Sequence, residues 1–336
     1  MVIALAACAR WEALPDEDFT PDPVHEDYPA RDELAAHPPG SSETHGVKVD
    51  MSPQSVVRFV ALGDAGTAYP AQFDVADAMR DVCAARGCDF AIYMGDNFYN
   101  TGVEAVDDPQ FDEKFEVPYA EIGFPFWTVT GNHDYGGNGA GYEFWKGQLY
   151  IDYAALSDRW RFPDLYYTVD YGLVDLFGLD TTAMMWGFYE GQQEWLDAAV
   201  AASDAEWTIA YGHHPILSNG PHGNVGVYDG YTSPMPIWDG AFVKEFMDSS
   251  VCGKIDVYMC GHDHSRQWLE DTCEGTELFV SGAGGKVSYL DGENPTWFEM
   301  DTEGFLWVEI EGKTFRGAFY DAFGNLEYER AYTKGD

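Results

Sequence analysis

The residues whose chemistry stands out first are an aspartate and a tyrosine three positions apart, in Gly95-Asp96-Asn97-Phe98-Tyr99. This segment follows an apolar run over residues 90–94, which predicts a buried strand. The Asp96 carboxylate has two oxygens and can bridge two cations. The Tyr99 phenol has an ordinary pKa of about 10, so a trivalent ion displaces its proton far more readily than a divalent one. If Tyr99 binds metal, we expect that metal to be ferric iron.

Four further polar motifs follow apolar runs directly, and each begins with glycine, which allows a sharp turn and a close approach to a ligand. Ligand sites in α/β sheets form at the carboxyl ends of the strands. Each motif alone could be a turn or a helix cap, but five in one chain predict a shared metal site. The donors include no thiolate, which disfavours a structural zinc site. The four motifs are Gly63-Asp64, Gly131-Asn132-His133-Asp134, Gly212-His213-His214-Pro215 and Gly261-His262-Asp263-His264.

The order of these five motifs resembles that of the calcineurin-like metallophosphoesterases. The tyrosine makes the chain more similar to the purple acid phosphatases, in particular the small tartrate-resistant type. The resemblance covers about residues 57–285. It implies an α/β fold of the α+β sandwich type, with two central mixed β-sheets flanked by helices and the metal site at the carboxyl ends of the strands.

The resemblance also implies a role for each motif residue. Ferric iron would be bound by Asp64, Tyr99 and His264, and Asp96 would bridge both metals. The second ion, a divalent iron, zinc or manganese, would be bound by Asn132, His213 and His262. His133 would protonate the leaving group, His222 would face the phosphate, and His214 would be structural.

Three positions depart from the family pattern, and one glycine-rich segment invites another interpretation. Ala65 and Gly66 follow Gly63-Asp64, where small members commonly have an aromatic residue, and Ser265 replaces the usual asparagine after His264. These changes spare the expected ligands but put substrate preference in doubt. The segment Gly282-Ala283-Gly284-Gly285-Lys286 lacks the ending of a nucleotide-binding loop, so we expect a tight turn near the metals.

The expected reaction is the hydrolysis of phosphate monoesters in acid. Two metals about 3.5–4 Å apart lower the pKa of a bridging water, which supplies a hydroxide nucleophile. Three anionic ligands and that hydroxide leave the centre with a net charge of about +1, which suits a phosphate dianion. His133, with an ordinary pKa of about 6.5, can donate a proton in acid. The alternatives are a phosphodiesterase or nucleotidase with two divalent metals, and a surface lipoprotein without turnover.

Apolar runs alternate with amphipathic helical patterns along the chain, which predicts an α/β core. We expect strands over residues 57–62, 90–94, 126–130, 174–179, 207–211, 255–259 and 278–280. One helix is expected through Phe73, Ala76, Met79 and Val82, and another around Trp195–Val200. Residues 305–310 and 314–320 are expected to form a hairpin that closes a sheet edge.

The composition is strongly acidic, with 58 Asp and Glu against 18 Lys and Arg and a net charge of −40. Such a surface repels nucleic acids and anionic lipids, so we expect neither as a partner. It is typical of a high-salt source or of an acidic extracellular protein. Six cysteines fit an exported chain. Cys83 with Cys88 and Cys252 with Cys273 are candidate pairs, and Cys260 is expected to be a buried thiol.

The first residues suggest how the chain is delivered. Leu5-Ala6-Ala7-Cys8 resembles a bacterial lipobox, in which the cysteine is acylated, although the basic start of a secretory signal is missing. We therefore expect a signal-like segment at 1–8, an acidic, proline-rich flexible spacer at 9–51 and a catalytic domain at 52–332. The expected protein is an exported monomer, either a lipoprotein anchored through Cys8 or a secreted or periplasmic enzyme.

Overall fold

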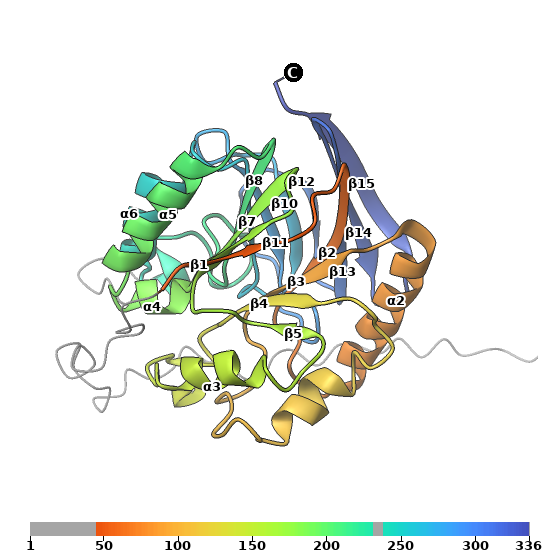
Figure 1. Ribbon diagram of the computed structural model, residues 1–336, viewed down its shortest axis with the longest axis vertical. Helices are drawn as coiled ribbons and strands as arrows, with labels where there is room; N and C mark the ends of the chain where they lie inside the picture. The colour runs from red at the N-terminus through yellow and green to blue at the C-terminus, as the bar shows by residue number, and fades with distance from the viewer. Residues whose placement is uncertain (1–44, 231–237, 336) are drawn as a thin grey trace, which may run out of the picture.

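Two β-sheets face each other across the centre of the molecule, and helices cover their outer sides (Figure 1). This arrangement comes from a computed structural model that describes residues 45–230 and 238–335. Both sheets contain parallel and antiparallel strand pairs. The expected α/β architecture with two central mixed sheets is therefore confirmed.

The first sheet has eight strands in the order β1-β6-β7-β8-β9-β11-β10-β12. Its centre, from β7 to β11, is parallel, and β6, β10 and β12 pair antiparallel with β7, β11 and β10 respectively. The strands are β1 (Val47–Asp50), β6 (Tyr167–Asp170), β7 (Val174–Gly178), β8 (Trp207–Tyr211), β9 (Val257–Cys260), β10 (Arg266–Leu269), β11 (Glu277–Ser281) and β12 (Thr296–Met300).

The second sheet has seven strands in the order β15-β14-β13-β2-β3-β4-β5. Strands β2 to β5 are parallel, and β13 joins β2 in the antiparallel sense. Its strands are β2 (Val56–Leu62), β3 (Phe90–Met94), β4 (Phe126–Val129), β5 (Trp160–Arg161), β13 (Gly304–Glu311), β14 (Thr314–Asp321) and β15 (Leu326–Thr333). Every residue of β3 is buried, as expected for a parallel strand covered on both faces.

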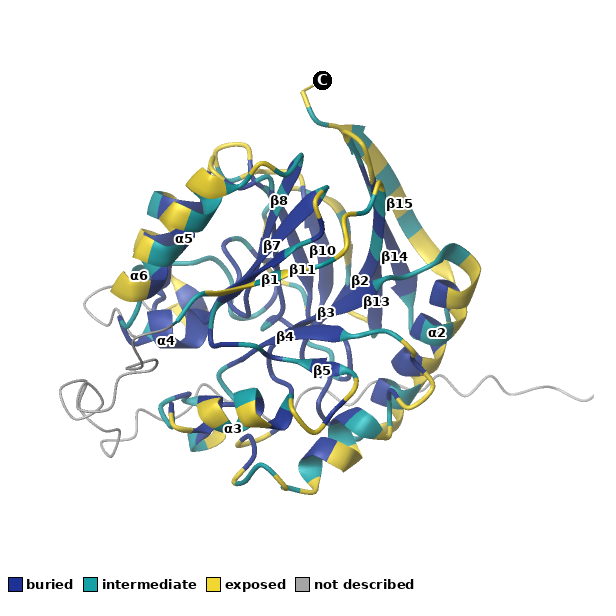
Figure 2. Ribbon diagram, in the orientation of Figure 1, coloured by how far each residue is buried: buried dark blue, intermediate teal, exposed yellow. Residues whose placement is uncertain are grey.

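Helices pack on the outer faces through one apolar side and leave the other exposed (Figure 2). Helix α2 covers the seven-stranded sheet, whereas α5 and α6 lie on the eight-stranded sheet (Figure 1). The α-helices are α2 (Pro70–Arg86), α3 (Lys146–Tyr153), α4 (Thr181–Met185), α5 (Glu190–Ala202) and α6 (Ala241–Phe246). Short π-helical or 3₁₀ turns occupy Asp112–Glu116, Gly137–Gly139, Tyr228–Gly230 and Met247–Val251.

Aromatic side chains hold the two sheets together. The ring of Phe90 on β3 stacks between Phe59 on β2, with centroids 5.0 Å apart, and Tyr171, which follows β6 of the other sheet, at 4.7 Å. These rings belong to a buried cluster that draws on strands of both sheets. Because the cluster fixes how the sheets face each other, it also sets how their strand ends meet.

The local patterns locate most elements correctly. Each expected strand coincides with a strand of the structure, and the two expected helices are α2 and α5. The hairpin is also confirmed as β13 and β14, but it does not form the sheet edge. Strand β13 pairs with β2 on its other side, and β15 pairs with β14 and forms the edge. The alternating exposed residues of β15 lack the apolar run that marks a buried strand.

Both candidate disulfides are present. Cys83 and Cys88 are bonded near the end of α2, and Cys252 is bonded to Cys273. Cys260 on β9 is a buried free thiol. The cysteine pairing expected from spacing is therefore confirmed in the described part of the chain.

The expected spacer at 9–51 ends too late. Residues Val47–Asp50 form β1, which pairs in parallel with β6, and Lys48 Nζ lies 2.7 Å from a carboxylate oxygen of Asp170. The strand is largely exposed and polar, so its sequence resembles a linker although its backbone belongs to the sheet. The lipobox-like segment and Cys8 lie outside the described residues. Among the described helices, none has the length and apolar character to cross a membrane.

Candidate metal centre and active site

The five glycine-led motifs lie at the carboxyl ends of strands from both sheets. Asp64, Asp96 and Asn132 follow β2, β3 and β4 of the seven-stranded sheet, and His213 and His262 follow β8 and β9 of the other. The two sets are in contact: His213 Nδ1, after β8, lies 2.9 Å from the backbone oxygen of Met94 at the end of β3. The site is therefore shared between the sheets.

Asp64, Tyr99 and His264 form one compact triangle of donor atoms. The Tyr99 hydroxyl donates to Asp64 Oδ1 at 3.1 Å and lies 3.0 Å from His264 Nε2. The third side, from His264 Nε2 to Asp64 Oδ1, is 3.5 Å. Donor atoms this close, with Asp64 fully buried and Tyr99 nearly so, can contact one ion together. These are the three residues expected to bind ferric iron.

A second triangle contains Asn132, His213 and His262. Nε2 of His213 lies 2.8 Å from Asn132 Oδ1 and 3.1 Å from His262 Nδ1. When Nδ1 of His213 donates its proton to the Met94 carbonyl, Nε2 is left with its lone pair facing this triangle. Histidines that ligate metals usually make such a bond with the other ring nitrogen. These three residues are the ones expected to bind the divalent ion.

Asp96 lies between the two triangles. Its Oδ2 is 3.5 Å from His213 Nε2, and its Oδ1 accepts the backbone N–H of His133 at 2.9 Å. One ligand atom each from Asp64, Asp96 and His213 lie within 4.8 Å of one another and could hold a metal ion. The structure thus brings the expected ligands together in two neighbouring groups, with the Asp96 carboxylate close to both Asp64 and His213.

The electrostatics of the buried carboxylates favour a bound cation. Burial raises the pKa of Asp64 well above its ordinary value, and the neighbouring Asp96 carboxylate adds to this. Burial opposes a charge on His213, yet Asp96 and Asp64 together raise its pKa to about 9. Two buried carboxylates that stabilise a protonated imidazole would also be stabilised by a bound cation. The oxygen and nitrogen donors fit iron, zinc or manganese.

Backbone conformation at the site is constrained. Asp64, Asp96 and His262 have φ angles of 58°, 51° and 69°, in the left-handed region that residues with a side chain rarely occupy. Strain of this kind gathers at functional sites, where the surroundings hold it in place. The motif glycines are needed for a close approach. A Cβ on Gly131 would lie 2.2 Å from Asp96 Oδ1, and one on Gly261 would lie 2.3 Å from Asp64 Oδ2.

The two expected catalytic histidines flank the ligands. His133 Nδ1 lies 2.8 Å from the carbonyl oxygen of Asn100, and its Nε2 is 4.0 Å from Asp96 Oδ2. The His133 side chain is 17% exposed, so Nε2 can reach a bound substrate. Burial lowers the pKa of His133, and the Asp96 carboxylate opposes this. On the other side, the His222 ring stacks on His262 with centroids 4.0 Å apart.

Two motif aspartates to which the sequence assigned no role position the loops. The buried Asp134 carboxylate accepts the backbone N–H groups of Asn97, Phe98 and Gly131, which ties the loop after β3 to the loop after β4. Asp263 accepts the backbone N–H of His222 at 2.9 Å and fixes that loop beside His262. Their place inside the motifs was the available signal.

Lys286 is a further residue that the sequence did not assign to the site. Its ammonium group lies 4.3 Å from the centroid of the Tyr99 ring. The expectation of a turn near the metals is confirmed, because Gly284 N–H donates to Gly63 and Ser288 N–H to His264. A lysine at the end of a glycine-rich turn is the signal in the sequence that points to this position.

The expected structural role of His214 agrees with its surroundings. His214 is buried, its Nδ1 lies 2.9 Å from the hydroxyl of Thr181, and its carbonyl accepts the hydroxyl of Tyr258. Ser265, one of the departures from the family pattern, accepts the side-chain amide of Gln267 at 2.8 Å. Its side chain therefore belongs to the packing behind the site.

Comparisons with known proteins agree with this geometry. Residues 57–266 match the family described as calcineurin-like phosphoesterase. The chain is 28% identical to tartrate-resistant acid phosphatase type 5 of Sus scrofa over 317 residues, which cover 81% of this chain and 86% of that protein. It is 29% identical to purple acid phosphatase 3 of Arabidopsis thaliana, with 80% and 76% covered.

Solved structures share the fold. Purple acid phosphatase PPD1 of yellow lupin superposes with a TM-score of 0.62 at 18% identity and covers 84% of this chain and 55% of that chain. GAP50, described as the anchor in the inner membrane complex of Plasmodium, has a TM-score of 0.62 at 21% identity, with 83% and 89% covered. The chain belongs to the calcineurin-like phosphoesterase family, as a metallophosphoesterase similar to the purple acid phosphatases.

Proposed function

We propose that this protein is a binuclear acid phosphatase that hydrolyses phosphate monoesters with Fe(III) and a divalent iron, zinc or manganese. The observation that carries the proposal is the pair of donor triangles on either side of Asp96. One triangle contains the phenol of Tyr99, which favours a trivalent ion, whereas the other has only amide and imidazole donors. This difference between the two halves supports two different metals.

The protein side chains would divide the remaining work. Bound metals would hold the phosphate and lower the pKa of a water. A water that has released one proton to solvent would form the new bond to phosphorus as the bond to the ester oxygen breaks, which gives inorganic phosphate. His133, held through Nδ1 by the Asn100 carbonyl, donates the proton on Nε2 to the departing alkoxide, which leaves as the alcohol. His222, whose ring stacks on the candidate ligand His262, would donate a hydrogen bond to the phosphate oxygens.

Metal analysis combined with a visible spectrum tests the metal assignment. Purified, air-exposed protein should contain iron together with a second metal and show a phenolate-to-iron band near the middle of the visible range. Tyr99→Phe should lose that band. The Tyr93 phenol, buried elsewhere in the core, provides the matched control, because Tyr93→Phe should keep the band. An iron-loaded protein without the band would favour the alternative, a phosphodiesterase or nucleotidase with two divalent metals.

A second test addresses the ester. Phosphate release from monoesters and diesters, measured from acid to neutral pH, should show monoester hydrolysis with an acid optimum. A faster reaction with diesters would reject monoester specificity while leaving the metal assignment intact.

A non-catalytic role is the other alternative, since one structural neighbour is described as an anchor. Against it, His133 is oriented and partly exposed beside the seven candidate ligands. Binding alone does not need an acid at this position, and turnover does. Absence of phosphate release from metal-loaded protein, across monoesters and pH, would favour the binding role.

We also propose that the chain is exported as a monomer and anchored through Cys8. Two disulfides support an oxidising compartment. Labelling with a radioactive fatty acid should mark the full chain but not Cys8→Ala. Equal labelling of both would reject the anchor, and a dimer in size-exclusion chromatography would reject the monomer.

A further inference from the structure

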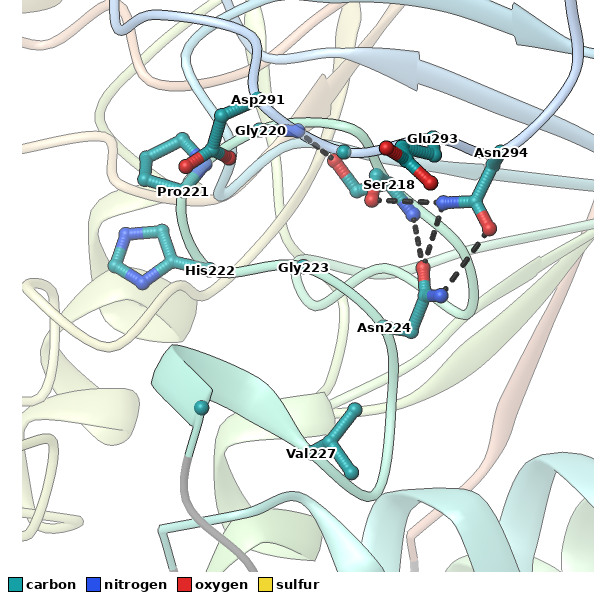
Figure 3. A pocket seen from close by; sticks show the side chains of 12 residues that line it. Ser218, Gly220, Pro221, His222, Gly223, Asn224, Val227, Asp291, Glu293 and Asn294 are labelled. Carbon is teal, nitrogen blue, oxygen red and sulfur yellow. Dashed lines mark hydrogen bonds between the residues drawn. The ribbon is translucent and has the colours of Figure 1, made fainter.

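A cavity of about 370 Å³ opens beside His222, between the loop after β8 and the loop that leads into β12 (Figure 3). His222 and Asp291 lie at one end, and Asn224 and Asn294 at the other. Because His222 also stacks on His262, the cavity adjoins the candidate metal centre. Its volume is at the lower end of the range for small-molecule sites, about 300–1,000 Å³.

One end of the cavity is built from a network of amides. Asn294 Nδ2 donates to the carbonyl oxygen of Ser218 at 2.9 Å and to Asn224 Oδ1 at 2.8 Å. Asn224 Nδ2 donates back to Asn294 Oδ1 at 3.1 Å. These bonds join the two loops across the end of the cavity, so the wall is fixed without a ligand. A polar wall of this kind suits a hydroxylated molecule better than an aromatic one.

The ionisable side chains of the wall set its charge. Asp291 and Glu293 are both exposed, and none of the described residues lining the cavity is a lysine or arginine. The third ionisable residue of the wall, His222, is paired through Nδ1 with Asp229 at 2.8 Å, so Asp229 balances a charge on its ring. Two carboxylates disfavour a second phosphate or a carboxylate in the ligand and favour a cation. The acidic cavity therefore contrasts with the metal centre, which takes the phosphate.

We infer that this cavity is the subsite for the alcohol part of the phosphate ester and that it selects small hydroxylated alcohols bearing an ammonium group. The inference rests on the proposed function and names its substrate class: aminated sugar or amino-alcohol phosphates. With the phosphate at the metals, the alcohol enters the cavity past His222 and places its ammonium group near Asp291 and Glu293.

Glucosamine 6-phosphate and glucose 6-phosphate form a matched substrate pair, because they differ in one ammonium or hydroxyl group. We expect kcat/KM to be about two to five times higher for the aminated sugar, the upper part of the range that exposed charge pairs contribute. Asp291→Asn/Glu293→Gln should bring the ratio of the two kcat/KM values close to one. The control Asp74→Asn/Asp77→Asn removes the same charge from exposed positions on α2, which covers the other sheet, and should keep the ratio.

A binding measurement that needs no turnover complements the kinetics. In a His133→Ala background, glucosamine 6-phosphate should raise the unfolding temperature more than glucose 6-phosphate, and the Asp291→Asn/Glu293→Gln change should remove the difference. About 1 M salt should compress the preference in both assays, because it screens exposed charges.

Three outcomes would overturn the inference in distinguishable ways. Equal kcat/KM values for the two sugars in the wild type, or a preference that survives the double substitution, would reject the subsite while the phosphatase function stands. Hydrolysis of p-nitrophenyl phosphate but of neither sugar phosphate would do the same. Absence of hydrolysis with all three esters would reject the proposed function itself, and the subsite with it.

Discussion

The ammonium group of Lys286 lies 4.3 Å from the ring centroid of Tyr99, although 187 positions separate the two residues in the sequence. The His133 ring lies on the same phenol, with centroids 4.5 Å apart. A cation and the candidate acid thus meet at the ring of Tyr99, which is itself a candidate metal ligand. The chain has a net charge of −40, so most of its surface repels a phosphate ester. We expect the positive charge of Lys286 to attract the ester to the candidate site.

Lys286→Gln should therefore weaken the reaction without removing metal. We expect kcat/KM for a monoester dianion to fall about tenfold, because one positive charge near the phosphate is lost. Lys286→Arg should retain most of the activity. Lys313→Gln, on the exposed turn between β13 and β14, is the charge-matched control. Unchanged kinetics in Lys286→Gln would show that the lysine only packs on Tyr99.

His133→Ala should separate turnover from metal binding. We expect kcat to fall about 100-fold or more, since loss of a general acid costs this much, while the metal content stays the same. Esters with a good leaving group, such as p-nitrophenyl phosphate, should lose less, because their alkoxide needs less help from a proton. Equal losses for good and poor leaving groups would argue against the acid role.

Gly261→Ala should impair metal binding. The added Cβ would lie 2.3 Å from Asp64 Oδ2, so the carboxylate must move out of its triangle. We expect a lower metal content and a weaker visible band with a cooperative unfolding transition retained. Gly123→Ala is the matched control, because a Cβ there meets nothing within 4 Å. Full metal loading of Gly261→Ala would show that the close approach is dispensable.

The buried Asp180 should make stability depend on pH. Burial raises its pKa to about 6, and its carboxylate accepts from the Tyr135 hydroxyl and the Ala183 N–H. The folded state then binds a proton more tightly than the unfolded state. This contribution is present below about pH 4 and is lost as pH rises through 6, at a cost of about 3 kcal/mol.

Urea unfolding of the wild type and of Asp180→Asn, from pH 4 to pH 7.5, measures this contribution. The difference in unfolding free energy should move in favour of the variant as pH rises, because asparagine does not titrate. Taking the difference cancels the groups that the two proteins share. A difference that stays constant across this range would show that Asp180 does not titrate there.

Most strands could be predicted from local sequence, because each buried parallel strand is a short apolar run that can be recognised by itself. Strand β3 is such a run, and Asp96 lies just after its carboxyl end, as the sequence predicted. Strands β1 and β15 are not predicted from the sequence, because their side chains are largely exposed and form no apolar run. Pairing with β6 and β14 places them in the sheets.

By itself, the sequence determined the inventory of the site: which donor types follow which strands, and that a phenol is among them. Only the tertiary structure decided how the donors are grouped. Tyr99 meets His264 across 165 positions, and His213 meets Asn132 across 81. The distances between these side chains depend on how the two sheets are oriented, and the buried cluster between the sheets fixes that orientation. The cavity beside His222 also depends on the tertiary structure, because two loops that are distant in the sequence form its walls.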